Sequence, residues 1–165
     1  MRIFGIDPGS RVTGFGIIET QGNKSIYVGS GVVTTKEKEF HKRLHIIFKE
    51  IENLMQEYQP DVVAIENVFM HRNADSALKL GQAKAAAICG TFKSGLTVYE
   101  YAAREVKQAV VGKGSAEKEQ VQYMVKIILS IKNRELRLDE SDALAIAICH
   151  AHSYEMKKTI KPLAR

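Results

Sequence analysis

The periodicity of apolar residues changes sharply near residue 40, and this change limits the class of fold. Before it, three strand-like segments are separated by short turns, at residues 2–6, 14–20 and 25–34. Residues 40–58 then place apolar side chains every three or four positions, which predicts a helix with one buried face. Residues 61–66 (DVVAIE) are a short apolar run, typical of a strand covered on both sides. This order predicts an α/β fold around a mixed sheet.

The second half of the chain is predicted to complete the sheet and to add helices around it. A fifth strand is expected at residues 97–101, and further helices at residues 73–92, 103–111, 116–129 and 141–152. Ser115 is the predicted N-cap of the helix at 116–129. The result is a five-stranded mixed sheet, with its first three strands antiparallel, flanked by helices. We assign residues 1–156 to this domain and expect the basic residues 157–165 to be a loosely ordered tail.

Composition and cysteine usage narrow the class of protein. The chain has 165 residues and a net charge of +5. Cys89 and Cys149 lie in apolar surroundings and lack the spacing of zinc ligands, so a zinc site is not expected. The N-terminus lacks the pattern of a signal peptide, and no apolar run approaches the roughly 18 to 20 residues that a membrane span needs. We therefore expect a soluble, cytoplasmic protein that does not contact membranes.

Four acidic residues stand where predicted buried elements end or begin. Asp7 follows the first apolar strand, and Glu66 ends the strand at 61–66. Asp139 and Asp142 precede the apolar segment ALAIAIC, and their spacing of three places both on one helix face. Each acid alone has a simpler explanation, since Asp initiates turns and first-turn acids complement the helix dipole. Glu66 is harder to explain in this way, because a charge at the edge of a core needs a partner.

Taken together, the four acids predict a metal site. Buried elements would bring all of them to one edge of the sheet, where carboxylates without cations raise one another's pKa values and destabilise the fold. Ligand sets made only of oxygen favour Mg²⁺, with Mn²⁺ as a substitute. Two such ions can hydrolyse a nucleic-acid phosphodiester. We therefore predict a nuclease in which both the metal ligands and the catalytic residues are Asp7, Glu66, Asp139 and Asp142.

Basic residues gather in one part of the chain. Residues 104–134 carry seven basic and three acidic side chains, an excess that suits contact with phosphates. The candidate DNA contacts in this segment are Lys107, Lys113 and Lys118. The sequence GKGS at 112–115 lacks the spacing of a nucleotide-binding P-loop, although its amides could hold a DNA phosphate.

The segment after Glu66 adds two further candidates for DNA contact, Phe69 and Arg72. Phe69 could belong to the core, or it could be exposed beside its polar neighbours and stack on a base. The helix at 73–92 carries a stripe of small residues that would let another backbone approach closely. This stripe comprises Ala74, Ala77, Leu78, Gly81, Ala85 and Ile88.

Four segments resemble the RuvC family of Holliday-junction resolvases, within the ribonuclease H-like superfamily. They are GIDPGSRVTGFG (5–16), AIENVFMHRNADSALKLGQA (64–83), YAAREVKQAVVGKGSAEKEQV (101–121) and DESDALAIAICHAH (139–152). They span most of the chain in the order of the family. The resemblance implies a ribonuclease H-like fold and places the family's catalytic acids on the four acids above. It also implies DNA-binding lysines at Lys107 and Lys118, and an aromatic contact with the junction centre at Phe69.

The resemblance further implies a Mg²⁺-dependent endodeoxyribonuclease of DNA recombination and repair. Such an enzyme is a homodimer that nicks two opposing strands symmetrically, leaves 5′-phosphate and 3′-hydroxyl ends, and works beside the RuvA–RuvB branch-migration complex. One chain offers one acid cluster, so two symmetric cuts call for a two-fold dimer. The stripe at 73–92 is our candidate interface; the alternative is that it packs only within its own protomer.

Three other functions fit parts of the pattern. An Asp-x-Gly turn before a hairpin also opens actin-like ATPases, but those folds need two such domains. A junction-binding module without catalysis would keep the fold and would not need the full set of acids. A nuclease acting on RNA–DNA hybrids would share both the fold and the acids. Metal-dependent nicking would exclude the module without catalysis. A comparison of junction and RNA–DNA hybrid as substrates would decide on the third alternative.

Overall fold

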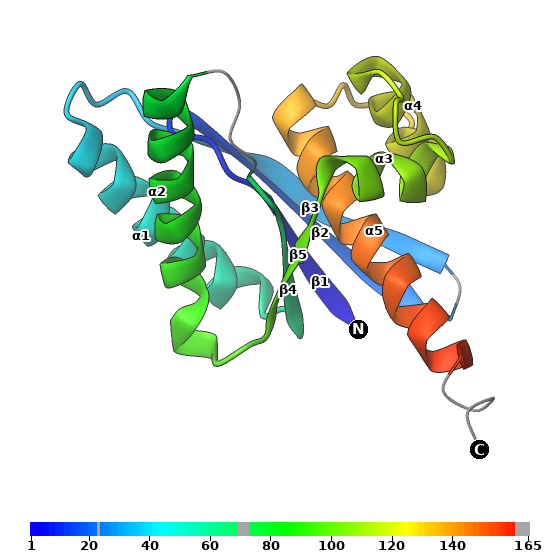
Figure 1. Ribbon diagram of the computed structural model, residues 1–165. Helices are drawn as coiled ribbons and strands as arrows, with labels where there is room; N and C mark the ends of the chain where they lie inside the picture. The colour runs from blue at the N-terminus through cyan, green and yellow to red at the C-terminus, as the bar shows by residue number, and fades with distance from the viewer. Residues whose placement is uncertain (23, 69–72, 161–165) are drawn as a thin grey trace.

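The protein is built around a five-stranded sheet, seen here in a computed structural model that describes residues 1–22, 24–68 and 73–160, without the side chains of 156–160 (Figure 1). The strand order is β3-β2-β1-β4-β5. The first three strands are antiparallel, whereas β4 and β5 run parallel to β1. The predicted mixed sheet is therefore confirmed. The strands are β1 (Arg2–Asp7), β2 (Val12–Gln21), β3 (Lys24–Thr34), β4 (Val62–Glu66) and β5 (Val98–Tyr101).

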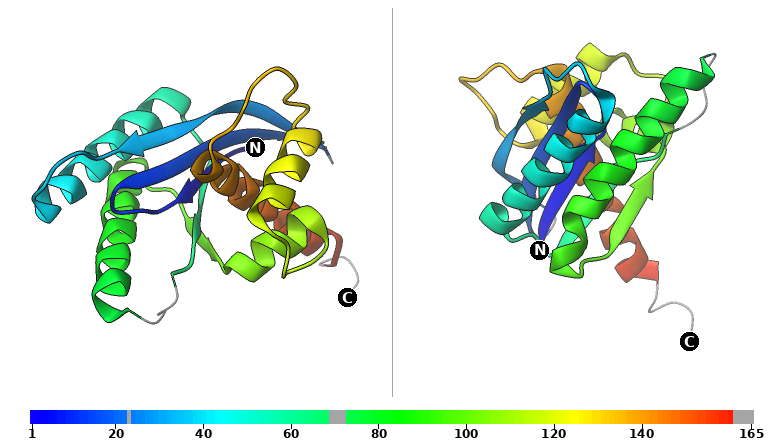
Figure 2. Two further views of the ribbon diagram at one scale, coloured as in Figure 1. Left: turned by 90° about the horizontal axis from the view of Figure 1, so that it is seen from above. Right: turned by 90° about the vertical axis from the view of Figure 1, so that its left-hand side faces the viewer.

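Helices cover both faces of the sheet. One layer holds α1 (Phe40–Tyr58), α2 (Ala74–Thr91) and the 3₁₀ turn η1 (Phe92–Ser94). The other layer holds α3 (Ala103–Val111), α4 (Lys118–Ile128) and α5 (Leu138–Ile160). Figures 1 and 2 show the sheet between these layers, with α5 lying along it. No helix in the described parts of the chain is long and apolar enough to cross a membrane.

The strand pleat decides which layer each β1 residue faces. Phe4 and Ile6 pack into the core on the side of α1 and α2, whereas Ile3 packs into the core on the side of α5. Because side chains alternate along a strand, Gly5 and Asp7 also face α5. The α5 backbone does lie close to Gly5, since a Cβ atom on Gly5 would be 2.1 Å from a carbonyl oxygen of α5.

Two predicted helix starts are wrong. The predicted N-cap Ser115 does not cap a helix, because residues 113–116 form a turn closed by the Ala116 N–H on the Lys113 carbonyl at 3.2 Å. The N-cap of α4 is instead Glu117, whose backbone N–H donates to Gln120 Oε1 at 3.1 Å. The last helix begins at Leu138, three residues before the predicted start.

The end of the last helix also differs from the prediction, because α5 continues to Ile160 instead of ending near His152. Ala151 is the last buried residue described in α5, and the sequence after it carries no apolar pattern that predicts a helix. Residues 157–160 of the predicted tail are therefore helical, and residues 161–165 lie outside the described residues. The division of the chain at residue 156 stays a prediction.

Candidate active site

Asp7 and Glu66 lie side by side at one edge of the sheet. β1 and β4 are parallel neighbours with Ile6 opposite Ile65, so the next residue of each strand reaches the same edge. Val62 and Ala64 face the α5 layer, and the pleat places Glu66 on that side with Asp7. The two carboxyl groups share a hydrogen bond. This register agrees with the prediction that the strands bring these two acids to one edge of the sheet.

Glycines of β2 bring the start of α5 onto this edge. Gly14 pairs with Asp7 across the β1–β2 ladder. A Cβ atom on Gly14 would lie 2.0 Å from the Asp139 carbonyl oxygen, and one on Gly16 would lie 2.7 Å from the Leu144 side chain. These strand glycines therefore leave room for the α5 backbone to lie directly on the sheet.

A cleft of about 190 Å³ lies between the sheet edge and helices α3, α4 and α5. Its polar lining comes from the carboxylates of Asp7, Glu66 and Asp142 and the ammonium groups of Lys107 and Lys118. Asp139 does not line the cleft, but its charge acts on Asp7 and Lys118. Three of the four predicted acids therefore share one cleft, and the fourth is within electrostatic reach of it.

The acids of the cleft raise one another's pKa values, because too few cations lie near them to balance their charge. Burial, followed by the charges of Glu66, Asp142 and Asp139, raises the pKa of Asp7 from 3.8 to about 8. Burial and the Asp142 charge also raise the pKa of Glu66. In the same cleft, the Nζ of Lys118 donates to Asp142 Oδ2 at 3.0 Å, and this bond raises the pKa of the lysine. Near neutral pH, Asp7 therefore retains a proton that it shares with Glu66.

The donor chemistry and charge of this site fit a divalent cation. The site offers oxygen ligands alone, and Asp7 is a buried carboxylate with too little positive charge nearby. Among the described residues, however, no three carboxylate, imidazole or thiolate side chains already form a closed set of metal ligands. Asp142 instead contacts Lys118. A metal ion would therefore compete with the lysine for this carboxylate.

The structure places two of the five predicted DNA contacts in the cleft, Lys107 and Lys118. Lys107 faces it from α3, and its charge acts on Glu66. Lys118 is the first residue of α4, and Lys113 is exposed on the loop that joins α3 to α4. Phe69 and Arg72 lie outside the described residues.

Sequence reasoning missed one buried lysine near the site. Lys84 of α2 has an 11% exposed side chain and pairs with Glu100 at 2.6 Å. Its ammonium group also donates to Asn67 Oδ1 at 3.2 Å, and the Asn67 N–H donates to the Tyr101 carbonyl at 2.8 Å. These bonds fix the chain directly after Glu66. No sequence pattern pointed to this lysine, because the predicted apolar stripe of the helix contains neither Lys84 nor its buried neighbour Ala83.

The sequence profile of the family described as "Crossover junction endodeoxyribonuclease RuvC" matches residues 3–150. The chain belongs to the RuvC family. It is 55% identical over 151 residues to the RuvC of Pseudoalteromonas translucida, covering 92% of this chain and 86% of that protein. It is 51% identical over 164 residues to the RuvC of Geobacter sulfurreducens, covering 99% of each chain.

Solved RuvC structures share the whole architecture. The RuvC of Thermus thermophilus superposes with a TM-score of 0.85 at 35% identity, covering 95% of this chain and 97% of that one. The same protein in complex with Holliday junction substrate gives a TM-score of 0.88 at 34% identity, over 95% and 96% of the chains. The yeast mitochondrial resolvase Ydc2 shares the fold, with a TM-score of 0.68 at 12% identity. The predicted ribonuclease H-like fold is confirmed.

Proposed function

We propose that this RuvC-family chain is an endonuclease that resolves four-way DNA junctions by paired, symmetric nicks, in recombination and repair. The observation that carries the proposal is the convergence of partly buried carboxylates from β1, β4 and α5 in one cleft beside Lys107 and Lys118. Its relatives are named crossover junction endodeoxyribonucleases, and the Thermus thermophilus RuvC was solved with a Holliday junction. An acidic centre within a basic rim suits hydrolysis of a bound phosphodiester.

We assign Mg²⁺ to the four acids, with Mn²⁺ as a substitute and two ions in each site. When bound, such ions activate a water molecule and stabilise the leaving oxygen of a phosphodiester. The protein's own part is to hold Asp7, Glu66, Asp139 and Asp142 on three rigid elements. Lys118 neutralises Asp142 in the absence of a metal ion and would be free to contact a phosphate once that carboxylate is engaged elsewhere. The products would carry 5′-phosphate and 3′-hydroxyl ends.

The remaining proposed DNA contacts surround this centre. Lys107 and Lys118 would contact phosphates from within the cleft, and Lys113 from the exposed loop beside it. Phe69 and Arg72 follow Glu66 in the sequence, and we propose that they contact the junction centre. Family membership leads us to propose the RuvA–RuvB complex as a partner. Because the substrate is chromosomal DNA, we expect the protein to act in the bacterial cytoplasm.

A salt titration tests Lys107 as a phosphate contact. We expect Lys107→Ala to weaken junction binding and to reduce the slope of log affinity against log salt by about one, because one phosphate contact is lost. Fluorescence anisotropy in EDTA at several salt concentrations measures this slope. Lys36→Ala, an exposed lysine outside the cleft, is the control and should change the slope less. Equal slopes for the wild type and Lys107→Ala would place Lys107 away from the phosphates.

We propose a homodimer that uses the exposed face of α2. The predicted stripe lies largely on the surface, because Ala74, Leu78, Gly81 and Ala85 are exposed while the core face of α2 carries Ala83 and Ala87. The side chain of Leu78 is unusually open for its size, at 67% exposure. An exposed apolar stripe on a helix is the kind of surface that a second copy covers.

A charge on this stripe should break the dimer. We expect Leu78→Arg to lower dimer affinity by at least about 100-fold, because two cations would face each other across a two-fold interface. Sedimentation velocity over a concentration series measures the shift. Tyr123→Arg is the matched control, since Tyr123 of α4 is 66% exposed. Dissociation by the Tyr123 variant alone would move the interface to α4.

A cleavage assay tests the proposed function. A synthetic four-way junction is labelled on one strand at a time and compared with linear duplex and with RNA–DNA hybrid, in Mg²⁺ and in EDTA. We expect paired symmetric nicks on the junction in Mg²⁺ alone. Junction binding without nicks would indicate a non-catalytic module. Preferential cutting of the hybrid would keep the metal chemistry and replace the substrate.

A further inference from the structure

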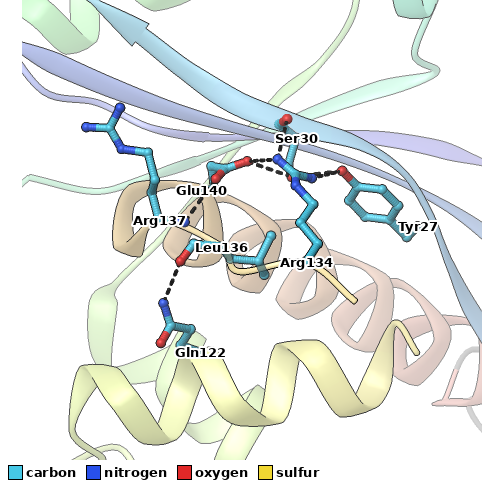
Figure 3. Close-up of polar contacts among 7 residues, drawn as sticks. All are labelled: Tyr27, Ser30, Gln122, Arg134, Leu136, Arg137 and Glu140. Carbon is cyan, nitrogen blue, oxygen red and sulfur yellow. Dashed lines mark hydrogen bonds and ion pairs between the residues drawn. The ribbon is translucent and has the colours of Figure 1, made fainter. Parts of the chain in front are cut away.

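A polar cluster ties the loop before α5 to the start of that helix. We call it the Glu140 cluster, and it comprises Tyr27, Ser30, Arg134, Arg137 and Glu140 (Figure 3). Arg134 forms an ion pair with the Glu140 carboxylate and also contacts the Tyr27 hydroxyl. Its Nη1 donates to Ser30 Oγ at 3.1 Å, and that hydroxyl donates to Glu140 Oε1 at 3.1 Å. The cluster therefore joins the loop, β3 and α5.

Glu140 is the buried centre of this cluster. Its side chain is 5% exposed, so its charge needs the partners that surround it. Glu140 Oε2 accepts the Arg137 backbone N–H at 2.9 Å, which satisfies one of the free N–H groups before the first turn of α5. The same carboxylate thus fixes where the helix begins and connects that point to β3.

Glu140 and the proposed metal ligands lie on different faces of this turn. Successive helix residues are rotated by about 100°, so Asp139 and Asp142 share a face that Glu140 does not. Figure 3 shows Glu140 pointing towards Ser30 and Arg134. From the opposite side, Gln122 of α4 donates to the Leu136 carbonyl at 2.8 Å. The segment that leads into α5 is therefore held on both sides, by α4 at Leu136 and by the Glu140 cluster at Arg137.

We propose that Arg134 and Glu140 are positioning residues, which orient the first turn of α5 so that Asp139 and Asp142 can bind divalent metal ions. This inference rests on the metal site of the proposed function. From Ala143 to Ala151, α5 is buried in the core and does not need the cluster to stay folded. Asp139 and Asp142 precede this buried part, so they depend on what holds the first turn. Loss of the cluster should therefore weaken metal binding more than it destabilises the domain.

Metal titrations on the full chain test this proposal without relying on activity. Isothermal titration calorimetry with Mn²⁺, in the absence of DNA, compares the wild type with Arg134→Ala, Glu140→Ala and the double variant. Replacing residues that hold metal ligands in place typically costs about 10- to 100-fold in metal affinity, and we expect about 10-fold here. The double variant should bind no more weakly than the worse single variant, because the two residues act as one unit.

The dependence of nicking on Mg²⁺ concentration, and a conservative substitution of Glu140, provide a second test of the proposal. The Mg²⁺ concentration for half-maximal nicking should rise about 10-fold for Arg134→Ala, whereas the rate at saturating Mg²⁺ and the junction affinity in EDTA should stay within about three-fold. Glu140→Gln keeps one oxygen, which can take the place of Oε2 and accept the Arg137 N–H, but it loses the charge that pairs with Arg134. It should therefore recover part of the metal affinity that Glu140→Ala loses.

A second buried glutamate supplies the matched control. Glu52 of α1 has a 7% exposed side chain and pairs with Lys93 at 2.6 Å, on the opposite face of the sheet. Lys93→Ala should leave Mn²⁺ affinity and Mg²⁺ dependence unchanged, even where it lowers the melting temperature.

The outcomes separate the two proposals. Unchanged Mn²⁺ affinity in both Arg134→Ala and Glu140→Ala would overturn the positioning role. A wild-type protein that binds Mn²⁺ but does not nick junctions would overturn the proposed function and leave the positioning role to be decided by the calorimetry. A wild-type protein that binds no Mn²⁺ would overturn both.

Discussion

Replacing Asp7 with Asn should lower the rate of junction nicking by at least about 1,000-fold while junction affinity in EDTA stays within about two-fold. Asn keeps the shape of the side chain but loses the charge at the centre of the acid cluster, and a metal-assisted reaction depends on that charge. The basic residues of the cleft are not altered. Single-turnover nicking and anisotropy on one junction measure the two quantities. Nicking at the wild-type rate would remove Asp7 from the catalytic residues.

The same substitution should stabilise the metal-free protein at high pH. The pKa of Asp7 is raised from 3.8 to about 8 in the folded state, so the folded state binds its proton more tightly than the unfolded state does. Wild-type stability should therefore fall as the pH rises between about 4 and 8, whereas Asn does not titrate. We expect Asp7→Asn to be more stable by several kcal/mol at pH 8 in EDTA, and by much less at pH 4.

Urea unfolding at the two pH values measures this difference. Mg²⁺ should reverse its sign at pH 8, because a bound cation stabilises the wild-type carboxylates and binds the variant less well. Asp61→Asn is the control, since Asp61 is an exposed acid at the other end of β4 that accepts the Arg2 N–H at 2.6 Å. Its nicking rate should equal that of the wild type. If Asp7→Asn were less stable than the wild type at pH 8 in EDTA, the pKa of Asp7 would not be raised by burial and by the neighbouring carboxylates.

The sequence predicted the meeting of Asp7 with Glu66 because strand periodicity carries that information. Apolar runs that end in an acid predict parallel strands with their acids at one edge, and the pleat then fixes the face. The register of Ile6 opposite Ile65 confirms this reading. The same logic predicted α1 with its bounds, because a 3.6-residue period over Phe40–Tyr58 is a long and strong signal.

The features that the sequence did not predict depend on contacts that form only in the folded chain. Ser115 is the residue type of an N-cap, but a turn between Lys113 and Ala116 moves the helix start to Lys118. The true start of α5 depends on Glu140, whose partners on β3 are more than 100 residues away in the chain. The balance between Lys118 and the acids likewise depends on packing, since a lysine on α4 and an aspartate on α5 meet only in the folded chain.

The close approach at Gly14 leads to the second large expected effect. Adding one methyl group there would place a Cβ atom 2.0 Å from the Asp139 carbonyl oxygen, so the start of α5 must move away from the sheet. We expect Gly14→Ala to reduce nicking by at least about 100-fold, because small displacements of catalytic groups have effects of that size. Overpacking of this kind should also lower the free energy of unfolding by about 3 kcal/mol.

A second glycine separates displacement of the acids from general destabilisation. Gly95 has φ of 64° with no atom near its missing Cβ, so Gly95→Ala strains the backbone without pushing on a neighbour. It should cost about 1 kcal/mol of stability and leave nicking unchanged. Measured below both melting temperatures, a nicking defect in Gly14→Ala alone would show that contact between β2 and α5 sets the position of Asp139. Equal nicking in the two variants would mean that the α5 acids can move with their helix and still act.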